Sequence, residues 1–246
     1  MIILFYIGIG TLVSLLLNYL ADVLPRDRKF SRPVCRKCLH PYSVKEYLFS
    51  FRCPECQSKS STRYWVVLIL SMVLSVALAL YPLPFTFWVS LPLVSFLALI
   101  VIIDIEHRAV LYETDIVGVI FGIVYGLLLH KPINMFFGGL FGAGIMLALY
   151  YLGVLFNRVL GKIRKQEIEE VALGFGDVFV CGYLGLVVGW PQAVGMVIIA
   201  ILIGGVFALG YLLTKMATRK YSAFSAIPYA PFLILATLLM FYLPAA

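Results

Sequence analysis

Charged residues are scarce in this sequence. They make up 13% of the 246 residues, whereas 63% are hydrophobic, and the mean hydropathy is +1.02. A soluble domain is about a quarter charged and about half apolar. The low charge therefore excludes an ordinary soluble domain and predicts a polytopic membrane protein. We expect an all-α fold, a bundle of transmembrane helices.

Several other features are missing. There is no long basic run and no aromatic-basic sheet motif, so we expect no nucleic-acid partner. No internal repeat or low-complexity tract is evident. The N-terminal stretch has neither a basic n-region nor a small-x-small cleavage site, so we expect it to be a retained helix and not a removed signal peptide.

What the sequence does contain is apolar stretches of spanning length. A transmembrane helix needs about 20 mostly apolar residues. The sixth stretch is shorter and rich in glycine, which lets helices approach closely in lipid. We expect about eight spans, at roughly 2–23, 65–81, 85–103, 115–130, 133–157, 177–189, 193–213 and 226–244.

The basic residues follow this alternation. If the chain crosses the membrane eight times, all but one of the 19 Lys and Arg residues fall in loops on one side, the exception being Lys131. The positive-inside rule makes that side cytoplasmic. The net charge of +7 fits loops that face anionic lipid. Both termini are then expected outside the cytoplasm.

Three parts follow from this pattern. Residues 1–23 are expected to form the first transmembrane helix, residues 24–64 a polar cytoplasmic insert, and residues 65–246 the membrane-embedded helical bundle. The insert of about forty residues has little apolar material for a core of its own, and a bound metal can supply the missing folding energy.

Four cysteines lie in the insert as two C-x2-C pairs separated by fourteen residues: Cys35, Cys38, Cys53 and Cys56. Four thiolates at this spacing suit one structural Zn²⁺ ion in a tetrahedral site. The alternative is two disulfides or free thiols, and a reducing cytoplasm argues against disulfides. His40 is a spare ligand that a complete shell of four cysteines does not need.

Two acids lie at the edges of apolar spans. Asp104 follows SFLALIVII at the cytoplasmic end of the third span, and Asp177 opens the sixth, directly after Gly174, Phe175 and Gly176. Ionisable groups within spans are costly and point to function. The alternative is that Asp104 simply ends a helix among the headgroups and that Asp177 caps the next helix.

If Asp104 and Asp177 meet, they cannot both ionise cheaply, so one keeps its proton and the other acts as a base. An aspartic protease needs this arrangement, because the base activates a water and the acid polarises the scissile carbonyl. Gly174 and Gly176 allow a tight turn and a close backbone approach, which an extended peptide can use. A proton-coupled transporter is the alternative, although it more often has acids at mid-bilayer and two related halves.

Taken together, the features resemble a known family. The order is an N-terminal span with Asn18 and then Leu24-Pro25, a four-cysteine insert followed by Arg63-Tyr64, an aspartate in IDIEH and another in GFGDV. This order is similar to that of the type IV prepilin peptidases, membrane aspartic proteases of the G-x-G-D class. The resemblance implies that Asp104 and Asp177 are catalytic and that Gly174 and Gly176 form the active-site turn.

The resemblance also implies substrates and cofactors. Members of this family cut the short basic leader from type IV prepilins or pseudopilins at the cytoplasmic face of the inner membrane, for type IV pili or type II secretion. Many also methylate the new N-terminus with S-adenosylmethionine. The sequence departs from the family pattern at Val110–Tyr112, at Phe179, and, near the parts associated with methyl transfer, at Val23 and Leu68. A peptidase without methyltransferase activity is therefore the alternative.

The remaining acids and the fifth cysteine receive plainer interpretations. Glu106 and Glu113 are expected to be solvated acids in the loop after Asp104, and Asp115 is expected to cap the fourth span. Cys181 is expected to be a small core residue. The acids of KQEIEE are expected to form a solvated face, or alternatively to attract a basic leader: Glu167, Glu169 and Glu170.

Overall fold

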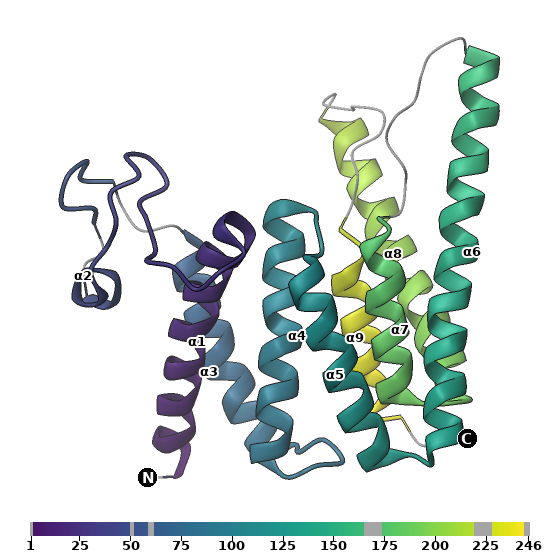
Figure 1. Cartoon of the computed structure of the whole chain (residues 1–246), viewed down its shortest axis with the longest axis horizontal. Coiled ribbons are helices and arrows are strands. Elements are labelled where there is room, and N and C mark those ends of the chain that lie inside the picture. Colours follow the sequence, from purple (N-terminus) through teal and green to yellow (C-terminus); the bar gives the residue numbers. More distant parts are fainter. Residues whose placement is uncertain (1, 50–51, 59–61, 165–173, 219–227, 244–246) are drawn as a thin grey trace. The chain divides into compact units, whose positions relative to one another are not determined.

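The structure is a computed structural model that describes residues 2–49, 52–58, 62–164, 174–218 and 228–243. Within these ranges it consists of helices, turns and isolated bridge residues, with no named strand (Figure 1). The helices are α1 (Ile2–Asp27), α2 (Val44–Phe49), α3 (Thr62–Leu80), α4 (Phe87–His107), α5 (Tyr112–Leu129), α6 (Pro132–Arg164), α7 (Gly176–Val188), α8 (Gln192–Ala217) and α9 (Ala230–Met240).

The expected all-α membrane fold is confirmed. By length and composition, α1, α3, α4, α5, α6 and α8 are able to cross a membrane, and α7 and α9 are shorter apolar helices. Each of these eight helices corresponds to one expected stretch. The short helix α2 was not expected. It begins after Ser43, whose backbone N–H donates to Glu46 Oε2 at 2.7 Å, a capping-box contact.

Helix ends are where expectation and structure differ. α4 continues to His107 instead of ending near residue 103, so Asp104 lies inside the helix and not after it. α6 continues to Arg164, beyond the expected end at residue 157. Hydropathy marks where a lipid-compatible segment ends, but polar residues continue a helix past that point. The expected start of the last span, at residue 226, lies outside the described residues.

The chain divides into two compact units, residues 1–102 and 103–246. In the first unit α1 packs against α3. A Cβ on Gly10 of α1 would lie 2.6 Å from the Ser71 carbonyl oxygen of α3, so the two backbones nearly touch. The Ser75 hydroxyl donates to the Tyr6 carbonyl oxygen at 2.8 Å, which ties the same two helices together.

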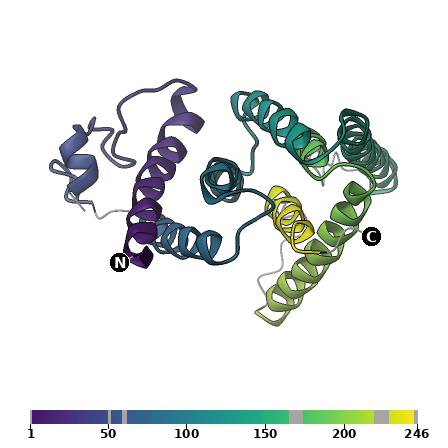
Figure 2. The ribbon, with the colours of Figure 1, turned by 90° about the horizontal axis from the view of Figure 1, so that it is seen from below.

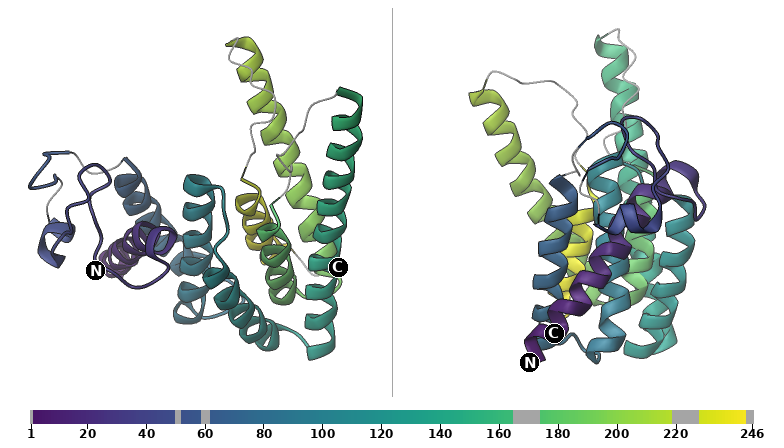
Figure 3. Two further views of the ribbon diagram at one scale, coloured as in Figure 1. Left: turned by 45° about the horizontal axis from the view of Figure 1, so that its top comes forward. Right: turned by 90° about the vertical axis from the view of Figure 1, so that its left-hand side faces the viewer.

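In the second unit α7 packs against both α5 and α6 (Figure 2). Glycines make the α6 contact close: a Cβ on Gly142 would overlap the Cys181 carbonyl oxygen, and Gly138 and Gly185 face each other in the same way. Cys181 is fully buried, as expected for a core residue. α6 and α8 extend past the first turn of α7 (Figure 3). The unit therefore holds its shortest helices, α7 and α9, beside long ones.

Two glycines of α6 make a matched test of this packing. Gly142→Ala forces a methyl group onto the α7 backbone, whereas Gly144 has nothing within 4 Å of an added Cβ. We expect Gly142→Ala to lower the thermal unfolding midpoint of the detergent-solubilised protein. Gly144→Ala should leave it unchanged or raise stability by up to about 1 kcal/mol, the helix propensity difference. Equal midpoints for the two variants would contradict the close α6–α7 contact.

Candidate active site and metal centre

The GFGD segment forms a closed turn at the start of α7. The backbone N–H of Asp177 donates to the Gly174 carbonyl oxygen at 3.1 Å. In return, the Gly174 N–H donates to Asp177 Oδ2 at 3.2 Å. The pair resembles a capping box, in which a side chain near the helix start reaches back to a free N–H. Asp177 therefore closes the turn, and only 6% of the residue is exposed.

The two glycines of this turn have different surroundings. A Cβ on Gly176 would lie 2.7 Å from the Val110 Cβ, in the segment between α4 and α5. A Cβ on Gly174 would lie at an ordinary contact distance of 3.5 Å from Asp177 Oδ2. The close approach expected at the glycines is thus made at Gly176 by the chain itself, through Val110.

Asp104 lies near the C-terminal end of α4, with its carboxyl group turned to the start of α9. Asp104 Oδ2 accepts a hydrogen bond of 3.2 Å from the N–H of Ala230, the first residue of α9. Helix N-termini carry free N–H groups and a partial positive charge, both of which favour a carboxylate. Because Asp104 is only 5% exposed, it is a buried group that meets a second helix and does not end its own helix among headgroups.

Two other acids of the second unit lie close enough to Asp177 to act on its charge. The Asp177 carboxyl group interacts electrostatically with those of Asp104 and Asp115. They come from α7, α4 and α5, so three helices converge where α7 and α9 begin and α4 ends. The structure thus brings together the two aspartates that the sequence singled out, and it adds a third.

The prediction that Asp115 caps its helix is wrong. The N-cap of α5 is Leu111 and makes no side-chain cap bond, while the Asp115 N–H donates to the Leu111 carbonyl oxygen at 3.0 Å within the helix. Asp115 is 5% exposed, and its Oδ1 has no hydrogen-bond partner within the described parts of the chain. Its inward orientation is signalled only by the glycines that follow at helical spacing, Gly118 and Gly122.

The other acids also differ from expectation. Glu106 lies in the last turn of α4 and Glu113 in the first turn of α5, so neither is a loop residue. Glu106 is 3.9 Å from His107 through Oε2 and Nε2, and its side chain is largely buried. Glu113 Oε2 is buried. Hydropathy placed both in a loop because it ended α4 too early, at residue 103, and began α5 too late, at residue 115. The acids Glu167, Glu169 and Glu170 lie outside the described residues.

The four cysteines of the insert form one cluster. All four Sγ atoms lie within 4.8 Å of one another. The Cys35–Cys56 and Cys38–Cys53 sulfur pairs are 3.6 and 3.5 Å apart, and all four cysteines are free. Sulfurs bound tetrahedrally to zinc at 2.3 Å are about 3.8 Å apart. The geometry therefore fits a four-thiolate metal site and does not contain the alternative disulfides.

The two C-x2-C pairs fold into equivalent knuckles. The Leu39 N–H donates to the Cys35 carbonyl oxygen and the Gln57 N–H to the Cys53 carbonyl oxygen, each at 3.0 Å. Leu39 and Gln57 have φ values of 62° and 56°, in the left-handed region that most residues avoid. The matching turns point both cysteine pairs toward one centre.

Groups around Cys35 support a thiolate at that position. Burial raises the pKa of Cys35, but hydrogen bonds from the Cys38 and Lys37 backbones and from the Tyr42 hydroxyl lower it, with a net result of about 6. A lowered thiol pKa favours the deprotonated form that metals bind. His40 Nδ1 instead pairs with Glu55 Oε1 at 2.9 Å, across the two knuckles. His40 is thus outside the ligand set, as expected.

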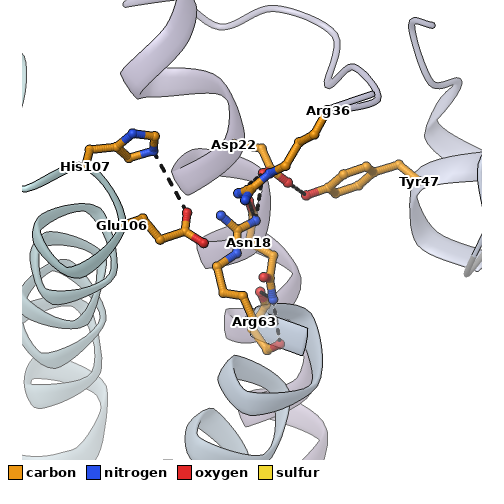
Figure 4. A network of polar contacts seen from close by, with 8 residues as sticks. Asn18, Asp22, Arg36, Tyr47, Arg63, Glu106 and His107 are labelled. Carbon is orange, nitrogen blue, oxygen red and sulfur yellow. Dashed lines mark hydrogen bonds and ion pairs between the residues drawn. The ribbon is translucent and has the colours of Figure 1, made fainter. Parts of the chain in front are cut away.

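Asp22 is a polar centre of the first unit that the sequence did not reveal. Its Oδ1 pairs with Arg63 at 2.7 Å and with Arg36 at 3.1 Å, and its Oδ2 accepts a hydrogen bond of 2.8 Å from Tyr47 (Figure 4). Arg36 and Tyr47 belong to the insert, and Arg63 lies in α3. One carboxylate of α1 thus fastens the insert to two membrane helices.

The GFGD turn gives a second matched pair of variants. Gly176→Ala pushes a methyl group against Val110, whereas Gly174→Ala adds only an ordinary contact. We expect Gly176→Ala to lower the thermal unfolding midpoint by more than Gly174→Ala does, with an overpacking cost of about 1–3 kcal/mol. Differential scanning fluorimetry of both variants in the same detergent measures this. A larger loss for Gly174→Ala would show that Val110 does not pack on the turn.

Comparison with known proteins found similarity to one family over part of the chain. Residues 91–209 match the type IV leader peptidase family. This segment contains Asp104, Asp115 and Asp177, and the cysteine insert lies outside it. No solved structure matches the chain.

Curated relatives cover more of the chain. Proteins named prepilin leader peptidase/N-methyltransferase align from Aeromonas salmonicida strain A449 (25% identical, 83% of this chain and 69% of the relative). A protein of the same name from Myxococcus xanthus strain DK1622 is 27% identical and covers 85% of this chain and 63% of the relative. One from Aeromonas hydrophila is 26% identical and covers 87% of this chain and 72% of the relative. These alignments extend beyond residues 91–209 and agree with that match. Residues 91–209 are therefore similar to the type IV leader peptidase family, and the wider alignments are to proteins of the matching name.

Proposed function

We propose that this chain is a membrane aspartic endopeptidase that removes the basic leader from type IV prepilins or pseudopilins. The observation that carries the proposal is the convergence of Asp104 and Asp177, two buried aspartates from different helices, inside the segment that matches the peptidase family. The charge distribution supports a site at the cytoplasmic face of the inner membrane, because nearly all basic loops lie on the side where α4 ends and α7 begins.

The proposed reaction is amide hydrolysis by a water held between the two acids. One aspartate takes a proton from the water, and the other donates a hydrogen bond to the scissile carbonyl oxygen. The resulting hydroxide attacks the carbonyl carbon, the C–N bond breaks, and the leaving amine takes up the proton that the first aspartate had removed from the water. Asp104 and Asp177 each use Oδ2 in a backbone hydrogen bond, which orients the carboxyl group and leaves Oδ1 for the water.

The cysteine cluster is assigned a structural role. Cys35, Cys38, Cys53 and Cys56 would hold one Zn²⁺ ion, which supplies folding energy to an insert too small to have much core. The Tyr42 hydroxyl, which hydrogen-bonds to the Cys35 and Cys53 sulfurs, would support the charged ligands from outside the shell. The peptidase reaction proposed above does not pass through this metal.

Methyl transfer is the second proposed activity. The relatives named prepilin leader peptidase/N-methyltransferase support it, with S-adenosylmethionine as the methyl donor. No residue of this chain is assigned to the donor. Val23 and Leu68 stand where the family pattern has an arginine and an acid, so a peptidase without methyl transfer is the competing proposal.

Replacing either catalytic aspartate tests the peptidase directly. We expect Asp104→Asn and Asp177→Asn each to lower the rate of prepilin cleavage by about 10²–10⁴-fold or more, because each removes a group that transfers a proton. Cleavage is followed by gel shift, and mass spectrometry of the new N-terminus shows whether a methyl group has been added. Asp27→Asn, at an exposed acid that ends α1, is the control and should cleave normally. Full cleavage activity in both Asp104→Asn and Asp177→Asn would contradict the proposed peptidase function.

Zinc content tests the role of the insert. We expect one zinc per purified chain by elemental analysis and a large loss of zinc in Cys35→Ser, because a four-thiolate site tolerates few missing ligands. Cys181→Ser, which changes the cysteine outside the cluster, should retain the metal. Well-folded protein that contains no zinc would contradict the assignment.

A further inference from the structure

Asp115 is the one acid of the converging three that the proposed reaction does not use. It is 5% exposed, and its Oδ1 has no hydrogen-bond partner among the residues that the structure describes. An unpaired buried polar atom is costly, and native structures rarely keep one without a reason. The position of Asp115 therefore calls for a ligand or a function.

The packing of α5 shows where Asp115 points. Asp115, Gly118 and Gly122 recur at helical spacing and share one face of α5. A Cβ on Gly118 would lie 2.6 Å from the Tyr183 ring, and one on Gly122 would lie 2.9 Å from the Tyr183 carbonyl oxygen, so this face is packed on α7. The Asp115 carboxyl group interacts electrostatically with Asp177 and with Tyr183, which places it on the side of α5 where α7 begins.

We propose that Asp115 is a substrate-positioning residue whose carboxyl group accepts a hydrogen bond from an N–H donor of the bound peptide, next to the bond that is cleaved. The proposal rests on the peptidase function proposed above. A carboxyl group has an acceptor oxygen whether or not it carries a proton, so an N–H donor is a suitable ligand for the unpaired Oδ1. Two sources have this chemistry: a backbone amide of the extended peptide, and an ammonium or guanidinium group of a basic side chain.

A structural role predicts a different behaviour. If Asp115 stabilised the fold, an apolar residue of similar size would weaken the protein. Because Oδ1 of Asp115 has no hydrogen-bond partner within the described residues, Asp115→Leu removes an unpaired buried polar atom and should be neutral or stabilising. Retaining such a group at a cost in stability is common where function needs it.

The test uses the full chain in detergent micelles, with a synthetic prepilin-type peptide as substrate. We expect Asp115→Leu to raise KM about tenfold while kcat stays within about threefold, because a binding contact is lost and the chemical groups remain. Its thermal unfolding midpoint should equal or exceed that of the unchanged protein. Glu113→Gln is the matched control, since Glu113 lies on the same turn with a buried oxygen but is not among the groups acting on Asp177, and its KM should not change.

Asp115→Asn separates the two donor sources, because it keeps an acceptor oxygen but loses the charge. A KM close to that of the unchanged protein supports a backbone amide. A KM raised as much as in Asp115→Leu supports a cationic side chain. In that case Asp115→Asn and the unchanged protein should have equal KM values for a peptide whose basic residues are replaced by neutral ones. An unchanged KM in Asp115→Leu, or a fall in kcat alone, overturns the proposal. If the unchanged protein cleaves no such peptide, the peptidase function itself fails, and the two failures are thereby distinct.

Discussion

The placement of Asp177 depends on the backbone contact between α6 and α7. α7 has 13 residues, about 20 Å of helix, which is shorter than the hydrocarbon core of about 30 Å. Such a helix must be held by protein, and in lipid the attraction between helices comes from close packing, because lipid tails are as apolar as the side chains. Gly138 and Gly142 of α6 provide that packing, and Gly118 and Gly122 of α5 hold the other side.

Because α7 is fixed in this way, backbone N–H groups at the starts of helices can donate hydrogen bonds to the buried acids. Asp177 closes the turn that begins its own helix, and Asp104 accepts from the first N–H of α9. Each aspartate is therefore oriented by a backbone N–H group at the start of a helix. Asp115 is the exception, since its Oδ1 has no donor among the described residues. The site thus contains two oriented acids and one acid that a bound peptide can satisfy.

Much of this arrangement was predictable from the sequence, because the membrane imposes simple rules. Apolar length located the helices, and the spacing of the cysteines predicted one cluster. The position of Asp104 and Asp177 at span edges marked them as candidates. The inward orientation of Asp115 was not predicted, because its only signal, Gly118 and Gly122 at helical spacing, does not by itself show which acid of a first turn faces its neighbour. The role of Asp22 was also hidden, since its partner Arg63 is about forty residues away and no local pattern links them.

The central claim is that Asp104 and Asp177 share one water at the scissile bond. A structure determined by electron microscopy with a bound, uncleaved prepilin peptide measures it most directly. Two hydrogen bonds of about 3 Å to a shared water require the nearest carboxyl oxygens to lie within about 6 Å of each other, on opposite sides of the scissile carbonyl. Carboxyl groups farther apart than that, or a scissile bond bound away from both aspartates, would contradict the account.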